Sequence, residues 1–259
     1  MGKVSTKNTW YHCSSFRGNI ERNPAVDPGF KNTALDGAGI YNNDNGTVWV
    51  RNSSVNDNTA GNDGGGIYND LDASVEVINS DVIGNEAAGQ GGGIYNNDAA
   101  TVNVTNSRLS LNTAEDGGAI FNELVSVLGI TNSTFATNQA SDDGGAIYND
   151  DGSVTSTRSI FSGNAAVDGG GVLYNASNGD VTFADDTMAL NTAGGRGGAA
   201  DNFGTLTILA GTLTDNTAAD GGAIASSRQL DVSGSQITGN QASSRGGAVF
   251  GDDAGVINI

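Results

Sequence analysis

One short motif recurs nine times in this chain of 259 residues, and it limits what the chain can fold into. Most copies are a glycine pair, a small residue and an apolar residue, as in "GGAI" at Gly117–Ile120. The spacing between copies is 24 to 27 residues, and the copies end at Ile40, Ile67, Ile94, Ile120, Ile147, Leu173, Ala200, Ile224 and Val249. A phosphate-binding loop is not repeated nine times in a domain, so the motif indicates a repeat architecture.

A second signature precedes each copy by eight or nine residues. It is an asparagine, found at Asn32, Asn58, Asn85, Asn112, Asn138, Asn164, Asn191, Asn216 and Asn240. An apolar residue stands three positions earlier in eight of the nine copies, such as Val82 before Asn85. Two more apolar residues lie five and seven positions before that one, such as Val75 and Val77.

The alternation V-x-V is typical of a β-strand, and no segment of ten or more residues has helical periodicity. Short strands, Gly/Asn/Asp turns and a period near 26 describe one rung of a parallel β-helix. The sequence therefore predicts an all-β, single-stranded parallel β-helix, a solenoid of about nine rungs. Rungs stacked about 4.8 Å apart would make a rod of roughly 40 Å.

This fold assigns a place to each residue of the motif. The glycine pair would form a corner that needs positive φ or close backbone approach. The following isoleucine would point inward and the tyrosine beside it outward, because strand side chains alternate. Asparagines one rung apart would hydrogen-bond along the axis in two columns: one runs from Asn32 to Asn240, and the other contains Asn42, Asn69, Asn96, Asn122, Asn149, Asn175 and Asn202.

The pairing of GGAI with FxxN resembles the repeats of polymorphic outer-membrane (Pmp-type) proteins over residues 32–259. Literal GGAI begins at Gly117, Gly144 and Gly221, and literal FxxN spans Phe135–Asn138 and Phe161–Asn164. The resemblance implies a right-handed β-helix, similar to an autotransporter passenger or a secreted surface protein. It also implies an association with adhesion.

The two ends differ from the repeats. Residues 1–31 contain both prolines, and "SSFRGN" resembles FxxN although Asn19 lies only 13 residues before Asn32. We expect an irregular first rung and an N-terminal cap there, because repeat rods need atypical ends. Residues 32–259 would be the repeats, ending without a cap at Ile257 and Ile259. Such an end predicts a fragment of a longer rod or end-to-end self-association.

The composition of the chain excludes some classes of binding partner. The formal charge is −18, and 24 of the 29 acidic residues are aspartate, so a nucleic acid partner is not expected. No apolar run is long enough to insert into a membrane, and no signal peptide is visible. The single Cys13 excludes an internal disulfide framework. The resemblance places the protein outside the cell or on its surface.

The tyrosines suggest a first candidate site. Tyr41, Tyr68, Tyr95, Tyr148 and Tyr174 share one column with Phe121. An exposed aromatic strip could stack on the sugar rings of a glycan. The structural alternative is an aromatic ladder that stabilises the rod.

The column before the glycine pair suggests a second site, for a metal ion. It holds Asp36, Asp63, Asp116 and Asp143, and neighbouring carboxylates would repel unless a cation lies between them. Ca²⁺ and Na⁺ favour oxygen ligands, so the column could gather either ion, and Ca²⁺ is the one cofactor that the sequence suggests. The alternative is that these aspartates cap backbone amides at the turn.

The sequence predicts a non-catalytic rod that acts as a stalk, adhesin or scaffold segment, with a glycan or a host cell surface as partner. The alternative is a polysaccharide-active lyase or glycoside hydrolase, or a carbohydrate-binding module. His12 is the only histidine and the arginines are scattered, which disfavours catalysis. An ice-binding rod is also disfavoured, since no outward column is uniformly threonine.

Overall fold

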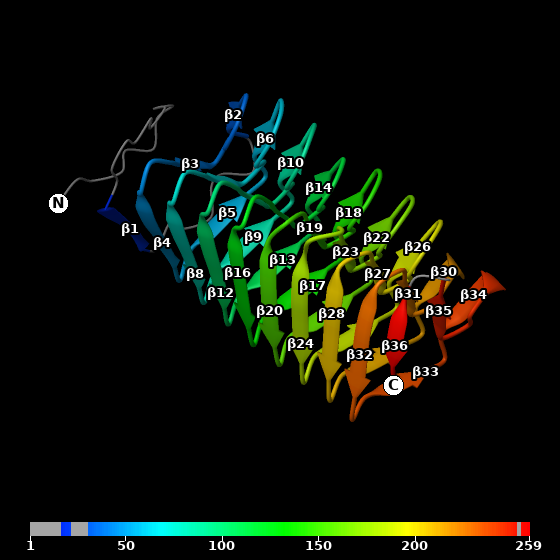
Figure 1. The fold of residues 1–259 in the computed structure, drawn as a ribbon. Helices are drawn as coiled ribbons and strands as arrows, with labels where there is room; N and C mark the ends of the chain where they lie inside the picture. The colour runs from blue at the N-terminus through cyan, green and yellow to red at the C-terminus, as the bar shows by residue number, and fades with distance from the viewer. Residues whose placement is uncertain (1–16, 22–30, 253–254) are drawn as a thin grey trace.

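The computed structural model describes residues 17–21, 31–252 and 255–259, which form 36 β-strands in a single coil (Figure 1). The strands lie side by side along the rod, from blue at the N-terminal end to red at the C-terminal end. They belong to four parallel sheets, in which each strand pairs with its counterpart one rung along. The described residues contain no helix, and hence none that is long and apolar enough to cross a membrane.

Two of the sheets carry the V-x-V and Ile-Tyr-Asn segments. The valine sheet is β1 (Arg17–Glu21), β4 (Thr47–Arg51), β8 (Ser74–Ile78), β12 (Thr101–Thr105), β16 (Val127–Thr131), β20 (Ser153–Thr157), β24 (Asp180–Ala184), β28 (Thr205–Leu209), β32 (Gln229–Ser233) and β36 (Val256–Asn258). The tyrosine sheet is β3 (Ile40–Asn42), β7 (Ile67–Asn69), β11 (Ile94–Asn96), β15 (Ile120–Asn122), β19 (Ile147–Asn149), β23 (Leu173–Asn175), β27 (Ala200–Asn202), β31 (Ile224–Ser226) and β35 (Val249–Gly251).

The other two sheets flank the asparagine of the FxxN segment. The phenylalanine sheet is β5 (Ser54–Asn56), β9 (Asp81–Ile83), β13 (Arg108–Ser110), β17 (Thr134–Ala136), β21 (Ile160–Ser162), β25 (Thr187–Ala189), β29 (Thr212–Thr214) and β33 (Gln236–Thr238). The alanine sheet is β2 (Thr33–Ala34), β6 (Thr59–Ala60), β10 (Glu86–Ala87), β14 (Thr113–Ala114), β18 (Gln139–Ala140), β22 (Ala165–Ala166), β26 (Thr192–Ala193), β30 (Thr217–Asp220) and β34 (Gln241–Arg245).

The register follows the sequence repeat. In the valine sheet, Val75 lies opposite Val102, and in the tyrosine sheet Ile94 lies opposite Ile120. Each rung therefore sets every motif residue over the same residue of the next rung. The predicted parallel β-helix of about nine rungs is confirmed.

The two glycines of the motif are required for different structural reasons. The first one adopts positive φ in every copy, for example +61° at Gly117. The second allows close approach, since a Cβ on Gly118 would lie only 2.4 Å from the carbonyl oxygen of Gly145 on the next rung. Both reasons proposed for the glycine pair are therefore present, one at each position.

The core is a stack of small apolar layers. The predicted inward residues Ile67, Val75, Val77 and Val82 are all fully buried. They belong to a single hydrophobic cluster that extends from Val48 to Val232. Because each rung is covered by its neighbours, a thin ring of apolar side chains suffices to exclude water from the interior.

Both predicted asparagine columns form hydrogen-bonded ladders inside the rod. In the tyrosine sheet each Nδ2 from Asn42 to Asn175 donates to Oδ1 of the next asparagine, over 2.7–2.9 Å. The column from Asn32 to Asn240 forms the same bonds over 2.7–3.0 Å. An amide is both donor and acceptor, so it can pair with its own copy on every rung.

A third ladder, of serines, was not predicted. The backbone N–H of Ser80 donates to Ser107 Oγ, and Ser107 Oγ donates to the carbonyl of Thr105. Asp186 takes the serine position after Ser159 and is 1% exposed. The core hydroxyl of Ser156 interacts with this buried carboxylate and acts to lower its pKa. An ionised carboxylate cannot donate as the serines do, so Asp186 is a weak point of the ladder.

The two ends of the rod differ in how they continue the sheets. Most of residues 1–31 lies outside the described residues, so the predicted first rung and cap stay a prediction. β1 pairs with β4 and sets Asn19 opposite Trp49, which places Asn19 in the valine sheet. At the other end, Ile257 lies opposite Leu230 as the V-x-V column predicts, and Ile259 is exposed.

The Asn32–Asn240 ladder should stabilise the fold. We expect Asn138→Ala to lower the free energy of unfolding by about 3 kcal/mol, because Leu109 O and the amide groups of Asn112 lose buried partners. Urea denaturation measures this loss. Gln139→Ala, which truncates an exposed side chain on the next residue, is the control and should change little. Equal effects of both substitutions would contradict the ladder's role.

Asp186 should make stability depend on pH. Burial raises its pKa to about 6, against an ordinary value of 3.8, although the N–H of Ser159 acts to lower it. The folded state therefore binds the proton more tightly than the unfolded state, and this stabilisation is lost as the pH rises through about 6. Asp186→Ser should be more stable than the parent chain by about 2–3 kcal/mol at pH 7.5, and less so at pH 4. Thermal melts of both chains across this range measure the difference, and a gap independent of pH would contradict it.

Candidate functional site

The predicted tyrosine column is a continuous aromatic stack. Ring centroids of Tyr41, Tyr68 and Tyr95 lie 4.8 and 4.9 Å apart, and the stack continues through Phe121 to Tyr148 and Tyr174 at 4.7–5.7 Å. The rings are near parallel, so each covers the faces of its neighbours. The stabilising aromatic ladder considered as an alternative is therefore present.

This geometry limits the glycan contacts that the tyrosines can make. Sugar rings stack on aromatic faces, and the faces inside the column are already occupied. Edges and hydroxyl groups remain, although Tyr95 is 7% exposed and its hydroxyl donates to Glu123 Oε2 over 2.6 Å. Burial raises the pKa of Tyr174 to about 12, so this hydroxyl stays protonated at neutral pH. Stacking of a glycan on these tyrosines stays a prediction, and the covered faces count against it.

The predicted aspartate column lies at the corner that leads into the tyrosine sheet. Each carboxylate accepts a hydrogen bond from the backbone N–H one rung along: Asp63 Oδ1 from Gln90, Asp116 Oδ1 from Asp143 and Asp143 Oδ1 from Gly169. These bonds are 2.7–3.1 Å long. The aspartates thus cap backbone amides at the corner, as the alternative interpretation supposed.

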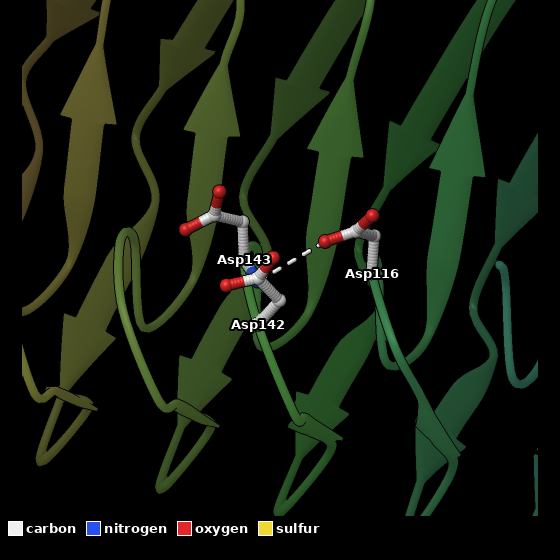
Figure 2. A group of neighbouring side chains, drawn as sticks. All are labelled: Asp116, Asp142 and Asp143. Carbon is white, nitrogen blue, oxygen red and sulfur yellow. Dashed lines mark hydrogen bonds between the residues drawn. The ribbon is translucent and has the colours of Figure 1, made fainter. Parts of the chain in front are cut away.

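One part of the column also gathers carboxylates. One carboxylate oxygen from each of Asp116, Asp142 and Asp143 lies within 4.8 Å of the other two. Figure 2 shows these three side chains. Asp142 is exposed, and the other two are half-buried. Three carboxylates at this separation could supply part of the oxygen shell that Ca²⁺ requires, with water completing it.

The electrostatics of this cluster favour a positive partner. The pKa of Asp143 is raised to about 7, mainly by burial and also by the charges of Asp142, Asp168 and Asp116, although the N–H of Gly169 acts to lower it. Burial also raises the pKa of Asp116. A cation between the carboxylates would offset both the lost hydration and the mutual repulsion.

The four predicted metal ligands are not equivalent. Asp116 and Asp143 come together, whereas Asp36 and Asp63 are bridged by the amide of Asn62, which donates to both over 3.1 and 2.8 Å. Asp142 was missed because it precedes the column by one residue. The Asp142–Asp143 pair in "SDDGG" was the available signal.

A second charged group was missed entirely. Arg196 stands in the aspartate column and Asp201 in the tyrosine column, and Arg196 Nε donates to Asp201 Oδ1 over 3.0 Å. The guanidinium also lies 4.9 Å from the ring centroid of Phe203 and donates to Ser227 Oγ. Phe203 itself lies 5.5 Å from Tyr174, so Phe203 extends the aromatic column and Arg196 covers its ring. The signal was the departure of both residues from their columns.

His12, the histidine considered for catalysis, lies outside the described residues. Arg196 and Arg245 share a column, with Asp220 on the rung between them. Arg245 pairs with Asp220. Each arginine therefore already has a carboxylate partner.

The acidic cluster should respond to cations. We expect a higher melting temperature in molar NaCl than at low ionic strength, because screening reduces repulsion within a chain of charge −18. Millimolar Ca²⁺ should give a smaller rise that EDTA reverses. Asp143→Asn should abolish the Ca²⁺ response, whereas Asp44→Asn, an exposed change at another corner, should retain it. Melting that is unchanged by either salt would show that the aspartates serve only as caps.

Two segments of the chain match a family model. Residues 52–70 and 132–150 match the Chlamydia polymorphic membrane protein (Chlamydia_PMP) repeat. Both segments cover the same part of a rung, from the corner after the valine sheet through the glycine pair to the end of the tyrosine strand. No curated protein and no solved structure matches the chain. The resemblance to Pmp-type repeats is thus confirmed at two positions, and the chain carries repeats of this type in a parallel β-solenoid.

Proposed function

We propose that this chain is a non-catalytic rod, displayed outside the cell or on its surface, that acts as a stalk, adhesin or scaffold segment. The main support is the unbroken parallel pairing of strands along all four sheets, through about nine rungs. Each added rung extends the rod and its outer faces without changing the core. Solenoids built this way present long surfaces to partners.

The family match supports surface display. The matched repeat is described as belonging to a polymorphic membrane protein, and it occurs here twice in the same register of the rung. A parallel β-solenoid fits a surface-displayed β-helix. The adhesive role is carried over from the resemblance to Pmp-type passengers, and we propose a glycan or a host cell surface as the partner.

The second candidate is cleavage of a polysaccharide. A Cβ on Gly169 would lie 2.8 Å from Asp201 Oδ2 and 3.0 Å from Asp143 Oδ1, so both carboxylates lie tightly against this glycine and near each other. Burial raises the pKa of Asp201 to about 6 and that of Asp143 to about 7, so either can be protonated near neutral pH. Glycosidases use two carboxyl groups about 5–9 Å apart. Asp201 is 2% exposed, which leaves little access for a substrate and favours the rod.

Cell binding tests the first proposal. The full chain, labelled at its only cysteine, Cys13, should bind epithelial or bacterial cells saturably, and unlabelled chain should compete. The heat-denatured chain is the control and should not compete. A reducing-sugar assay on acidic polysaccharides should show no release. Polysaccharide cleavage that is abolished by Asp143→Asn would contradict the non-catalytic function and favour the enzyme. If the chain binds to no cell, the adhesive role is rejected and only a stalk or scaffold role remains.

A further inference from the structure

The corner between the valine and phenylalanine sheets carries a column of asparagines that neither ladder uses. Asn52, Asn79, Asn106 and Asn132 occupy it on four successive rungs, all with φ between 47° and 50°. Asparagine tolerates this left-handed conformation better than most residues. All four side chains are exposed. Because the backbone geometry repeats, their amides leave the rod in the same way on each rung.

A shallow groove of about 370 Å³ runs along this corner. Its lining includes Asn79, Asn106 and Asn132 from the asparagine column. It also includes the first residues of three strands, namely Asp81 of β9, Arg108 of β13 and Thr134 of β17. The groove therefore spans three rungs, which is about 10 Å along the rod.

The lining offers hydrogen bonds in both directions. Asn132 Nδ2 donates to Asn106 Oδ1 over 2.6 Å, which leaves the Asn106 amide N–H groups and Asn132 Oδ1 for a ligand. Arg108 Nε donates to Asp81 Oδ1 over 3.2 Å, with the two side chains 55% and 42% exposed. This bond uses one of the five N–H groups of the arginine. The lining thus contains both donors and acceptors.

The charge of the lining selects the class of ligand. Asp81 and Arg108 balance, so the groove is neutral within a molecule of charge −18. The overall field repels anionic polymers, and the acidic cluster at the opposite corner attracts cations more strongly than a neutral groove does. Hydroxyl groups both donate and accept hydrogen bonds, as this lining requires. We propose that the groove binds a neutral oligosaccharide lying along the rod axis.

This proposal rests on the adhesive role proposed above and names its ligand class and its site. The groove coincides with the rungs that carry asparagine at the corner. Farther along the rod the same column continues as Arg158 and Asp185, and the facing column as Ile160 and Thr187. These rungs offer the same backbone with different side chains, so they provide a matched control within the chain.

The experiment is a titration of the full chain with short neutral oligosaccharides, hexose and N-acetylhexosamine series, followed by side-chain amide NMR shifts and calorimetry. We expect saturable shifts of the Asn79, Asn106 and Asn132 amides. Asn106→Ala combined with Arg108→Ala should weaken binding at least about tenfold, because several ligand hydrogen bonds are lost. Asp185→Ala combined with Thr187→Ala should leave the affinity unchanged.

Three results would overturn the proposal. They are no binding of any neutral oligosaccharide, tighter binding of an acidic glycan than of every neutral one, and equal weakening by the control pair. Both altered pairs are at the surface, so thermal melts should show that each variant stays folded. Cell binding separates this proposal from the adhesive role: binding that survives Asn106→Ala with Arg108→Ala retains the adhesin and rejects the groove.

Discussion

The stacking of every residue on its counterpart one rung along is the constraint on which this structure depends. In such a column, a residue is favourable only if it interacts well with its own copy. Asparagine amides satisfy this condition because each donates to the next, as Asn112 does to Asn138. Valines pack on valines and tyrosines stack on tyrosines. The ladders fix the register, since a shift by one residue would leave buried amides without partners.

Aspartate does not interact favourably with its own copy one rung along, because two carboxylates repel each other. The fold limits this cost by turning each carboxylate toward a backbone N–H of the next rung, as Asp143 does toward Gly169. Part of the cost persists where Asp142 adds a third carboxylate. The stacking of each residue on its own copy makes the rod regular, and it also concentrates negative charge at one corner. We expect cations to stabilise the folded state at this corner.

Residues that differ from the rest of their column introduce charged groups that the repeat itself does not contain. Asp186 replaces a serine and brings a buried acid into the core. Arg196 replaces an aspartate, and its guanidinium pairs with Asp201 and lies over the ring of Phe203. The neutral groove around Asn106 and the acidic corner around Asp143 lie at different corners of the rung. One rod can thus present two surfaces of different chemistry.

The sequence alone determined the fold, because a period of 24–27 residues with fixed apolar and asparagine positions admits one way of burying each column. It also determined which residues form the columns, including Asp36, Asp63, Asp116 and Asp143. Only the tertiary structure decided how column neighbours meet: Tyr95 is covered on both faces, and Asp142 joins a cluster from outside its column. The groove at Asn79, Asn106 and Asn132 was equally invisible. Spacing fixes which residues lie one rung apart, whereas side-chain direction and neighbouring corners depend on backbone geometry that spacing does not contain.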